Sequence, residues 1–403
     1  MARLPEGDLA PADGSLPESA LAGLAGRPFG LYLHVPFCAT RCGYCDFNTY
    51  VPGEDGAAHS GYLAGVLAEL DLAKGVLGDS APPVETVFVG GGTPTILSAA
   101  ELAAMVRAIG ERFELAPGAE ITSEANPESV DPAKLSAMRE AGFTRLSLGM
   151  QSAVPSVLAT LDRVHTPGRP EAAVAEARAA GFEQVSLDLI YGAPGEAAED
   201  WRASLDAALS ASPDHISTYS LIVEPGTRMA AQVARGELVV PDEEVIVDRF
   251  ETAEQVLAEA GMHWYETCSW AIDEAAHCRH NINYWTGGNW WGVGPGAHSH
   301  VGGVRWWNGL HPRIWAERLG VGESPAAARE LPDEESSRLE DVMLGLRLRT
   351  GVELARLTPE GRSAAQRQLE LGMLEPDDHA DGRAVLTLRG RLMADPVTIE
   401  LAA

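Results

Sequence analysis

Basic residues are scarce in this chain of 403 residues. Lysine and arginine number 30 against 58 aspartates and glutamates, which gives a formal net charge of −28. Binding to nucleic acids depends on clustered Lys and Arg side chains that neutralise phosphates. We therefore expect no nucleic-acid partner.

Long apolar runs are also missing: no stretch reaches the roughly 18 apolar residues of a membrane-spanning helix. Residues 1–27 are rich in Pro, Ala, Gly and acids, and they lack the basic start and apolar core of a signal peptide. We expect them to form a flexible N-terminal tail on a cytoplasmic protein. The hydrophobic content of 45% and the chain length indicate one large globular domain plus a smaller one.

Cysteine is scarce too, but three of the five stand together in Cys38-Ala-Thr-Arg-Cys42-Gly-Tyr-Cys45. The low count suits a reducing compartment better than a disulfide framework. Soft thiolates bind iron–sulfur clusters, zinc or copper(I), and a closed structural zinc site needs four ligands. Three thiols on a loop after an apolar run favour a four-iron cluster whose fourth iron stays open to a small molecule. The alternatives are three ordinary buried cysteines, or a zinc site completed by Cys268, Cys278 or a histidine.

Short β-branched runs alternate with Ala- and Leu-rich stretches from residue 29 onward, a pattern typical of βα units in a parallel sheet. The predicted strands are 30–35, 85–89, 120–123, 145–148, 184–189 and 215–221. The helices predicted between them are 60–76, 99–113, 132–141, 169–180 and 197–210. Six such units predict an α/β fold, a partial (β/α)6 TIM-like barrel over residues 28–250.

Polar or Gly-rich residues stand at or just beyond the carboxyl end of every predicted strand. They are the cysteine loop, Gly90-Gly-Gly-Thr-Pro-Thr95, Glu124, Gln151, Asp188 and the segment 219–224. Barrels and open α/β sheets bind ligands at this edge, so we expect the six loops to form one site. Each element also has an ordinary alternative, because glycines form turns and acids cap helices.

Two further polar residues need separate interpretations. Arg163 has the fork geometry that holds a carboxylate, although a solvated surface arginine is the ordinary expectation. His34 lies inside the first predicted strand and is interpreted as a core histidine with its hydrogen bonds satisfied.

Residues 251–325 differ in character from the rest of the chain. Eight of the nine tryptophans and six of the eleven histidines lie between Gly261 and Trp315, around His280-Asn-Ile-Asn-Tyr-Trp285. Neutral imidazole is a common ligand of heme iron, and aromatic rings suit a porphyrin face. The alternative is an aromatic-rich strand that closes the open edge of the barrel. The glycine-rich run 292–298 is too flexible for a helix and suits a close backbone approach to a ligand.

The last part of the chain predicts a separate small domain. Residues 326–335 read as a linker, 336–348 and 358–371 as helices, and 384–387 as a strand before the segment 389–395. This order predicts a C-terminal winged-helix-like α+β domain over residues 326–403. Because it has no clear basic face, a packing or partner-docking role is favoured over DNA binding.

These motifs resemble the oxygen-independent coproporphyrinogen III oxidase family of radical SAM proteins and, within it, the HemW-type heme chaperone branch. The resemblance covers nearly the whole chain after the N-terminal tail. Its strongest elements are His34-Val-Pro-Phe-Cys38 with the cysteine triad, Gly90-Gly-Gly-Thr-Pro-Thr95, Glu124-Ala-Asn-Pro127, Ser147-Leu-Gly-Met-Gln-Ser152 and His280-Asn-Ile-Asn-Tyr-Trp285.

The resemblance implies a radical SAM barrel in which Cys38, Cys42 and Cys45 ligate a [4Fe-4S] cluster. It implies that S-adenosylmethionine occupies the open iron, and that His280 is a heme ligand. The positions implied to line the S-adenosylmethionine pocket are Tyr32, Tyr44, Gly91, Gly92, Thr93, Glu124, Gln151, Arg163 and Asp188.

One departure from the family pattern bears on activity. The oxidases resemble C-x3-C-x2-C-x-C, whereas this chain has Phe47 at the position of the fourth cysteine. A phenyl ring cannot replace a thiol, so porphyrinogen decarboxylation is disfavoured. A second departure, Cys268 after Tyr265-Glu-Thr, leaves an unexplained thiol near the proposed heme region.

The resemblance therefore implies a heme chaperone that binds heme and delivers it to acceptor hemoproteins, soluble or membrane-bound, with a homodimer left open. The alternatives are a radical SAM oxidase that decarboxylates coproporphyrinogen III, and a barrel with a structural zinc and no heme.

Overall fold

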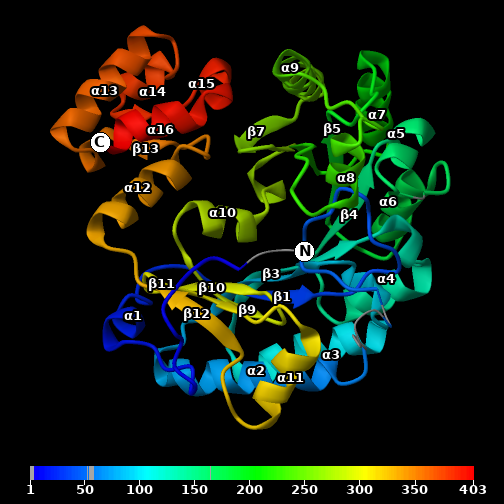
Figure 1. Cartoon of the computed structure of the whole chain (residues 1–403), viewed down its shortest axis with the longest axis vertical. Helices are drawn as coiled ribbons and strands as arrows, with labels where there is room; N and C mark the ends of the chain where they lie inside the picture. Colours follow the sequence, from blue (N-terminus) through cyan, green and yellow to red (C-terminus); the bar gives the residue numbers. More distant parts are fainter. Residues whose placement is uncertain (1–3, 52, 54–58, 164) are drawn as a thin grey trace.

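Strand β1 (Phe29–Val35) lies inside a twelve-stranded sheet in the computed structural model, which describes residues 4–51, 53, 59–163 and 165–403 (Figure 1). Six of its seven residues are buried, as expected for a strand covered on both faces. The strand order in the sheet is β12-β11-β10-β9-β1-β2-β3-β4-β5-β6-β8-β7.

The six central strands pair in parallel and in chain order, which confirms the predicted partial barrel. After β1 they are β2 (Val84–Gly91), β3 (Leu115–Ala125), β4 (Arg145–Gln151), β5 (Gln184–Tyr191) and β6 (His215–Ser220). The helices between them are α2 (Tyr62–Leu77), α3 (Ala99–Arg112), α4 (Pro132–Glu140), α5 (Pro155–Thr160), α6 (Arg169–Ala179) and α7 (Ala198–Ser210).

Helix α3 shows how local sequence sets these elements. Ser98 and Glu101 form a capping box that satisfies backbone N–H groups at the first turn. Leu102, Met105 and Ile109 recur at a spacing of three to four residues and are buried. The resulting apolar stripe is the kind that packs a helix against a sheet.

Residues 263–330 extend the sheet at both edges. On one side β9 (Asn289–Val293) pairs in parallel with β1, and β10 (His298–Val301), β11 (Val304–Asn308) and β12 (Ala326–Glu330) follow in antiparallel order. On the other side β8 (Ser269–Ala271) pairs with β6, and β7 (His263–Glu266) pairs with β8. Aromatic-rich strands thus lie beyond both edges of the six-stranded barrel. Helices α8 (Arg228–Ala234) and α9 (Glu243–Glu259) precede this region, and α10 (Arg279–Trp285) and α11 (Pro312–Gly320) lie within it.

The expectation of a flexible tail is wrong for residues 4–27. They include helix α1 (Glu18–Ala22), and Ala20 and Leu24 are almost completely buried. Asp8 forms an antiparallel bridge with Arg329 at the sheet edge. The burial of Ala20 and Leu24 and the backbone pairing of Asp8 hold this segment in place. These contacts cannot be predicted from the amino-acid composition of the segment.

The predicted linker at 326–335 is also wrong in part, because residues 326–330 form β12. The run Ala326–Glu330 has little intrinsic strand preference, and it becomes a strand through its pairing with β11. Likewise the boundary predicted at residue 250 falls inside α9. We propose domain boundaries near residues 260 and 331 in place of the predicted boundaries at 250 and 325.

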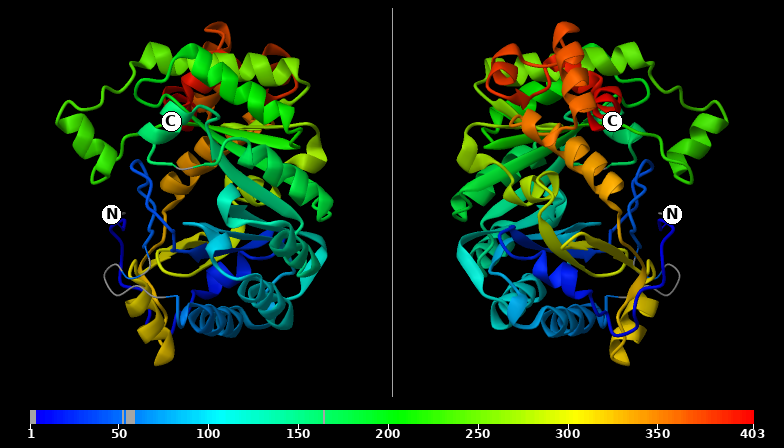
Figure 2. Two further views of the ribbon diagram at one scale, coloured as in Figure 1. Left: turned by 90° about the vertical axis from the view of Figure 1, so that its right-hand side faces the viewer. Right: turned by 90° about the vertical axis from the view of Figure 1, so that its left-hand side faces the viewer.

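The C-terminal part forms an α+β unit with its own buried core. Its elements are α12 (Glu334–Gly345), β13 (Val352–Glu353), α13 (Pro359–Glu370), α14 (Pro376–Ala380), β14 (Arg383–Ala384), α15 (Leu388–Leu392) and α16 (Ala394–Ala402). It lies beside α9 and β7 in all three views (Figures 1 and 2), where Arg391 packs on the rings of Phe250 and Trp264 and pairs with Glu254 at 2.7 Å. The winged-helix assignment stays a prediction. In the described part of the chain, no helix has the length and apolar character to cross a membrane.

Candidate functional site

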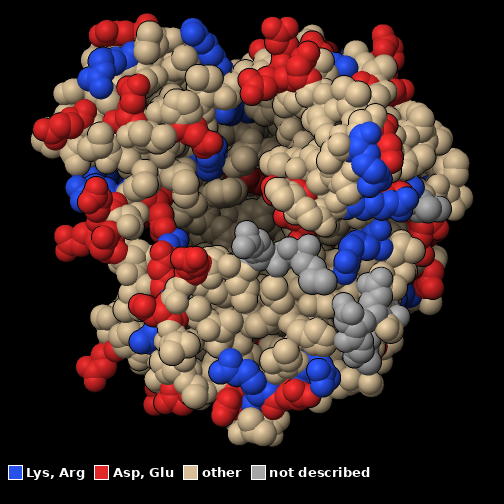
Figure 3. Space-filling model, viewed as in Figure 1, with Lys and Arg blue, Asp and Glu red and all other residues tan. Residues whose placement is uncertain are grey.

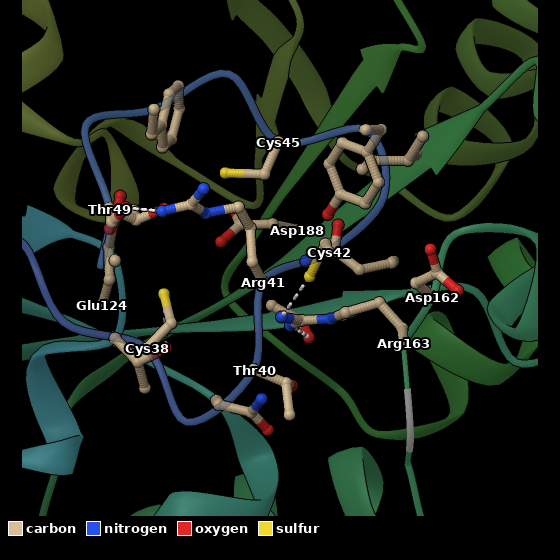
Figure 4. Close-up of a pocket in the computed structure, with 18 of the residues that line it drawn as sticks. Cys38, Thr40, Arg41, Cys42, Cys45, Thr49, Glu124, Asp162, Arg163 and Asp188 are labelled. Carbon is tan, nitrogen blue, oxygen red and sulfur yellow. Dashed lines mark hydrogen bonds between the residues drawn. The ribbon is translucent and has the colours of Figure 1, made fainter. Parts of the chain in front are cut away.

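The loop after β1 carries the three cysteines into a cavity of about 550 Å³, and Figure 4 shows their sulfur atoms facing a common space. Thr93 Oγ1 donates to Cys38 Sγ at 3.7 Å, and Arg163 Nη1 donates to Cys42 Sγ at 3.6 Å. Burial raises the pKa of Cys38 to about 11 and also raises the pKa of Cys45. Such thiols ionise when a bound metal compensates the charge, so the environment suits ligation.

The shape of the loop fits a group larger than one ion. A Cβ atom on Gly92 would lie 2.6 Å from Phe37 O and 2.9 Å from Cys38 Sγ, so only glycine permits this approach. Among the described residues, no three His, Cys, Asp or Glu side chains are placed to hold a single metal ion. Three thiols around a wider space fit a [4Fe-4S] cluster better than the zinc alternative.

Asn48 anchors the end of the cysteine loop. The side-chain Nδ2 of Asn48 donates to Pro295 O at 3.0 Å and to Leu310 O at 2.8 Å. The backbone carbonyl oxygen of Asn48 lies 2.9 Å from His34 Nε2. The other ring nitrogen of His34 is 2.9 Å from the Tyr32 hydroxyl. His34 is therefore a satisfied core histidine, as expected. Sequence reasoning missed Asn48, because its partners lie about 250 positions away in the chain.

Two partly buried carboxylates lie in the carboxyl-terminal halves of β3 and β5. Burial raises the pKa of Glu124 to about 8, with a further contribution from nearby Asp188, and Gly91 N donates to Glu124 Oε2 at 3.0 Å. Burial raises the pKa of Asp188 to about 6, although Ser147 Oγ donates to its Oδ2 at 2.9 Å. Neither residue caps a described helix, and both line the cysteine cavity. Ser147 positions Asp188, and in the sequence nothing distinguishes it from the other residues of the motif 147–152.

The other predicted pocket residues also lie around the cysteine cavity. Tyr44, Gly91, Gly92, Thr93, Gln151 and Arg163 all line it. Gln151 has a positive φ of 65°, a conformation that costs energy and often occurs at functional sites. Arg163 Nη2 donates to Gly149 O at 2.9 Å, which orients the guanidinium towards Cys42.

Tyr32 is the exception among the predicted cofactor positions. It lines a second cavity of about 290 Å³ that adjoins the first and shares Glu124, Ser147, Asp188 and Tyr219 with it. Because Tyr32 stands six residues before Cys38, inside β1, it lies deeper in the barrel than the cysteine loop. Its assignment to the S-adenosylmethionine pocket stays a prediction.

The surroundings of His280 differ from those expected of a heme ligand. Its Nδ1 lies 2.8 Å from Thr86 Oγ1 and its Nε2 lies 2.8 Å from the Tyr284 hydroxyl. The side chain is 1% exposed, and burial lowers its pKa to about 3. Although His280 lines the smaller cavity, both of its ring nitrogens are engaged in hydrogen bonds with other side chains. We therefore do not retain His280 as a heme ligand.

This chain is similar to known proteins in both sequence and fold. Residues 32–208 match the model of the Radical SAM superfamily. A Mycobacterium tuberculosis (strain H37Rv) protein named heme chaperone HemW is 51% identical over 378 residues, which cover 94% of this chain and 95% of that protein. The chain belongs to the HemW family.

Other relatives agree with this placement. The Escherichia coli K12 protein of the same name is 36% identical over 275 residues, which cover 68% of this chain and 70% of that protein. The solved structure of coproporphyrinogen III oxidase (HemN) from Escherichia coli matches with a TM-score of 0.80 and 22% identity, over 97% of this chain and 94% of that one. At that identity the likeness establishes the fold alone. Membership of the radical SAM superfamily implies a [4Fe-4S] cluster and S-adenosylmethionine.

A buried ion pair fixes the start of α10 in this HemW-family chain. Arg145 Nε lies 3.2 Å from Glu120 Oε2, and Arg145 Nη2 donates to the carbonyls of Ala276 and His277 at 2.7 and 2.8 Å. Glu120 also accepts the backbone N–H of His280 at 3.0 Å. Both charged residues stand at the starts of predicted strands, where surface residues are expected. Only the three-dimensional structure shows that they form a buried ion pair.

Gly92→Ala is expected to lower the cluster content of the reconstituted protein several-fold, because the added methyl group meets Phe37 O and Cys38 Sγ. Iron and sulfide per chain after anaerobic reconstitution measure this. Gly75→Ala in α2 is the matched control, since nothing lies within 4 Å of its added methyl group. Equal iron content in the two variants would show that the close approach of Gly92 is unimportant.

Proposed function

We propose that this protein is a heme chaperone that binds a [4Fe-4S] cluster, S-adenosylmethionine and heme, and delivers heme to acceptor hemoproteins. The observation that carries the proposal is its 51% identity, across nearly the full length of both chains, to a protein named heme chaperone HemW. The acceptors are soluble or membrane-bound. A homodimer and a cytoplasmic location belong to the same proposal, and five free thiols suit a reducing compartment.

In this proposal Cys38, Cys42 and Cys45 would hold the cluster, in the cavity that Glu124 and Asp188 also line. Glu124 and Asp188 are suited to ribose hydroxyls and to the ammonium group of S-adenosylmethionine. The backbone of residues 91–93 approaches the ligand closely because it carries two glycines. When bound, the cluster with S-adenosylmethionine supplies one-electron chemistry.

The affinity for S-adenosylmethionine is expected to rise with pH between 6 and 8.5. The pKa values of about 8 for Glu124 and about 6 for Asp188 mean that Glu124 in particular is protonated at neutral pH in the free protein. A cationic ligand favours the ionised forms, so binding releases protons and strengthens as they are lost. For one proton the gain is at most about tenfold per pH unit. Calorimetry in a pH series measures it.

Glu124→Gln is the control for this dependence, because an amide cannot ionise. Its affinity should be lower and nearly flat between pH 6 and 8.5 apart from the contribution of Asp188. A pH-independent affinity in the unaltered protein would remove Glu124 from the binding site.

The rival function is oxidative decarboxylation of coproporphyrinogen III, favoured by the likeness in fold to the oxidase HemN. Against it, Phe47 stands where the oxidases carry a cysteine, and its side chain is 59% exposed at the cavity rim. Anaerobic incubation of the reconstituted protein with coproporphyrinogen III and S-adenosylmethionine distinguishes the two. We expect no protoporphyrinogen, and stoichiometric or greater formation would support the enzyme.

The heme-binding part of the proposal is tested by anaerobic titration of the reconstituted protein with hemin, followed by Soret absorbance. A saturable spectrum with one heme per chain is expected. Absorbance that rises without saturation would contradict the chaperone function.

A further inference from the structure

One row of residues crosses the inner face of the sheet from β2 to β11. Thr86 pairs with Gly30, Gly30 with Trp290, Trp290 with His300, and His300 with Arg305. Directly paired residues in neighbouring strands project from the same face of a sheet. Trp290 and His300 therefore continue the face on which His280 and the smaller cavity lie.

His280 fits on this face because Gly30 has no side chain. A Cβ atom on Gly30 would lie 3.3 Å from the ring of His280. From His280 the rings pack in sequence: 4.7 Å separates its centroid from that of Tyr284, 4.5 Å separates Tyr284 from Trp290, and 5.1 Å separates Trp290 from His300. The His280-Asn-Ile-Asn-Tyr-Trp285 motif thus supports Trp290 and His300 from behind.

His300 has the arrangement of a histidine prepared to bind a metal. Its Nδ1 lies 2.8 Å from Gly288 O, while within the described part of the chain Nε2 takes part in no hydrogen bond. A carbonyl that accepts from Nδ1–H fixes the tautomer and leaves the Nε2 lone pair free. The ring is only part-buried, so Nε2 is accessible. Burial also lowers the pKa of His300, which keeps the imidazole neutral at pH 7.

Its neighbour His298 is a weaker candidate. Its ring is exposed and packs on Trp307 with centroids 5.8 Å apart. Among the described residues no hydrogen bond fixes its tautomer or orientation, unlike the bond from His300 to Gly288.

Arginine is available beside His300 for a carboxylate. Arg27 and Arg305 both lie close enough to His300 to lower its pKa. Arg305 is neutralised by Glu330 at 2.9 Å and by Glu340. Arg27 donates to Gly287 O at 3.1 Å, and in the described part of the chain it forms no ion pair. The planar fork of an arginine side chain matches the carboxylate of a propionate.

In the space-filling view, which has the orientation of Figure 1, the surface is hollowed at the place of α10 (Figure 3). Helix α10 carries His280 and Tyr284, and the ring of Tyr284 packs on Trp290.

We propose that heme docks on this face, with His300 Nε2 as an axial ligand, Trp290 against the porphyrin and Arg27 at a propionate. The inference rests on the proposed heme-chaperone function and assigns its cargo site. It also gives His280 a positioning role, through Tyr284, in place of ligation.

The test is a hemin titration of the full-length reconstituted protein and its His300→Ala variant, followed by Soret absorbance. We expect the variant to bind at least tenfold more weakly with a shifted Soret band, and added imidazole to restore the band of the unaltered protein. His263→Ala on β7, an exposed histidine, is the matched control and should titrate normally. Arg27→Ala should bind several-fold more weakly with an unchanged Soret position, because it alters the propionate contact alone.

The outcomes distinguish the proposed His300 site from the proposed heme-chaperone function. If the unaltered protein and His300→Ala bind hemin with the same affinity and spectrum, the His300 site is wrong and the chaperone function stands. If the unaltered protein shows no saturable binding, the chaperone function itself fails. His300→Gln keeps a polar side chain able to donate to Gly288 O, so it replaces His300→Ala if the latter does not fold.

Discussion

Cys42→Ser is expected to abolish the broad iron–sulfur absorbance of the reconstituted protein while the fold stays intact. Cys42 is partly exposed on its loop, and Arg163 Nη1 donates to its Sγ at 3.6 Å. Removing one of three thiolates leaves a cluster without enough protein ligands. Binding of S-adenosylmethionine should be lost with the cluster, whereas far-UV circular dichroism and the melting temperature of the apo protein should hardly change.

Cys268→Ser is the matched control for this experiment. Cys268 lies between β7 and β8, outside the triad, so its loss should leave the iron content unchanged. If Cys268→Ser removed the metal as completely as Cys42→Ser, a four-thiol site would replace the three-thiol cluster. Global unfolding of Cys42→Ser would instead show that the loop is part of the structural core.

Arg145→Ala is expected to lower the free energy of unfolding by about 3–5 kcal/mol, because breaking a buried ion pair leaves an uncompensated charge. The side chains of Arg145 and Glu120 are 2% and 7% exposed, and Arg145 also holds the carbonyls of Ala276 and His277. Its removal frees the start of α10, so hemin affinity should fall as well. Denaturant unfolding of the apo protein measures the stability change.

Arg202→Ala provides the comparison for an exposed ion pair. Arg202 pairs with Asp206 at 2.9 Å on α7, where both side chains are 54% exposed. Such pairs contribute about 0.5 kcal/mol or less. If Arg145→Ala were no more destabilising than Arg202→Ala, the Glu120–Arg145 pair would not anchor α10.

The six barrel strands were predictable because each is a short, largely apolar run with a polar or glycine-rich segment at or just beyond its carboxyl end. Glu124 and Asp188 needed no further information, since parallel strands bring their carboxyl ends to one edge. The cysteine triad was equally predictable, because its three thiols lie within residues 38–45 of the chain. These features depend on neighbouring residues, and the structure places them as expected.

The parts that sequence reasoning missed depend on distant partners. The sequence around His280 favours a ligand, but Thr86, 194 positions away in the chain, occupies one of its ring nitrogens. Strand β12 forms through its pairing with β11, and residues 4–27 are held by contacts with the far edge of the sheet. The row Gly30, Trp290 and His300 follows from strand register, which a single sequence does not display.

The most direct test of the heme-chaperone account is the transfer of heme from the loaded protein to a purified apo-hemoprotein, followed by absorbance. The account predicts that the transfer rate rises and then saturates with acceptor concentration, because delivery takes place within a complex of the two proteins. A rate that is independent of acceptor concentration, and equal to the rate of heme loss to a non-protein scavenger, would show passive release and contradict the account.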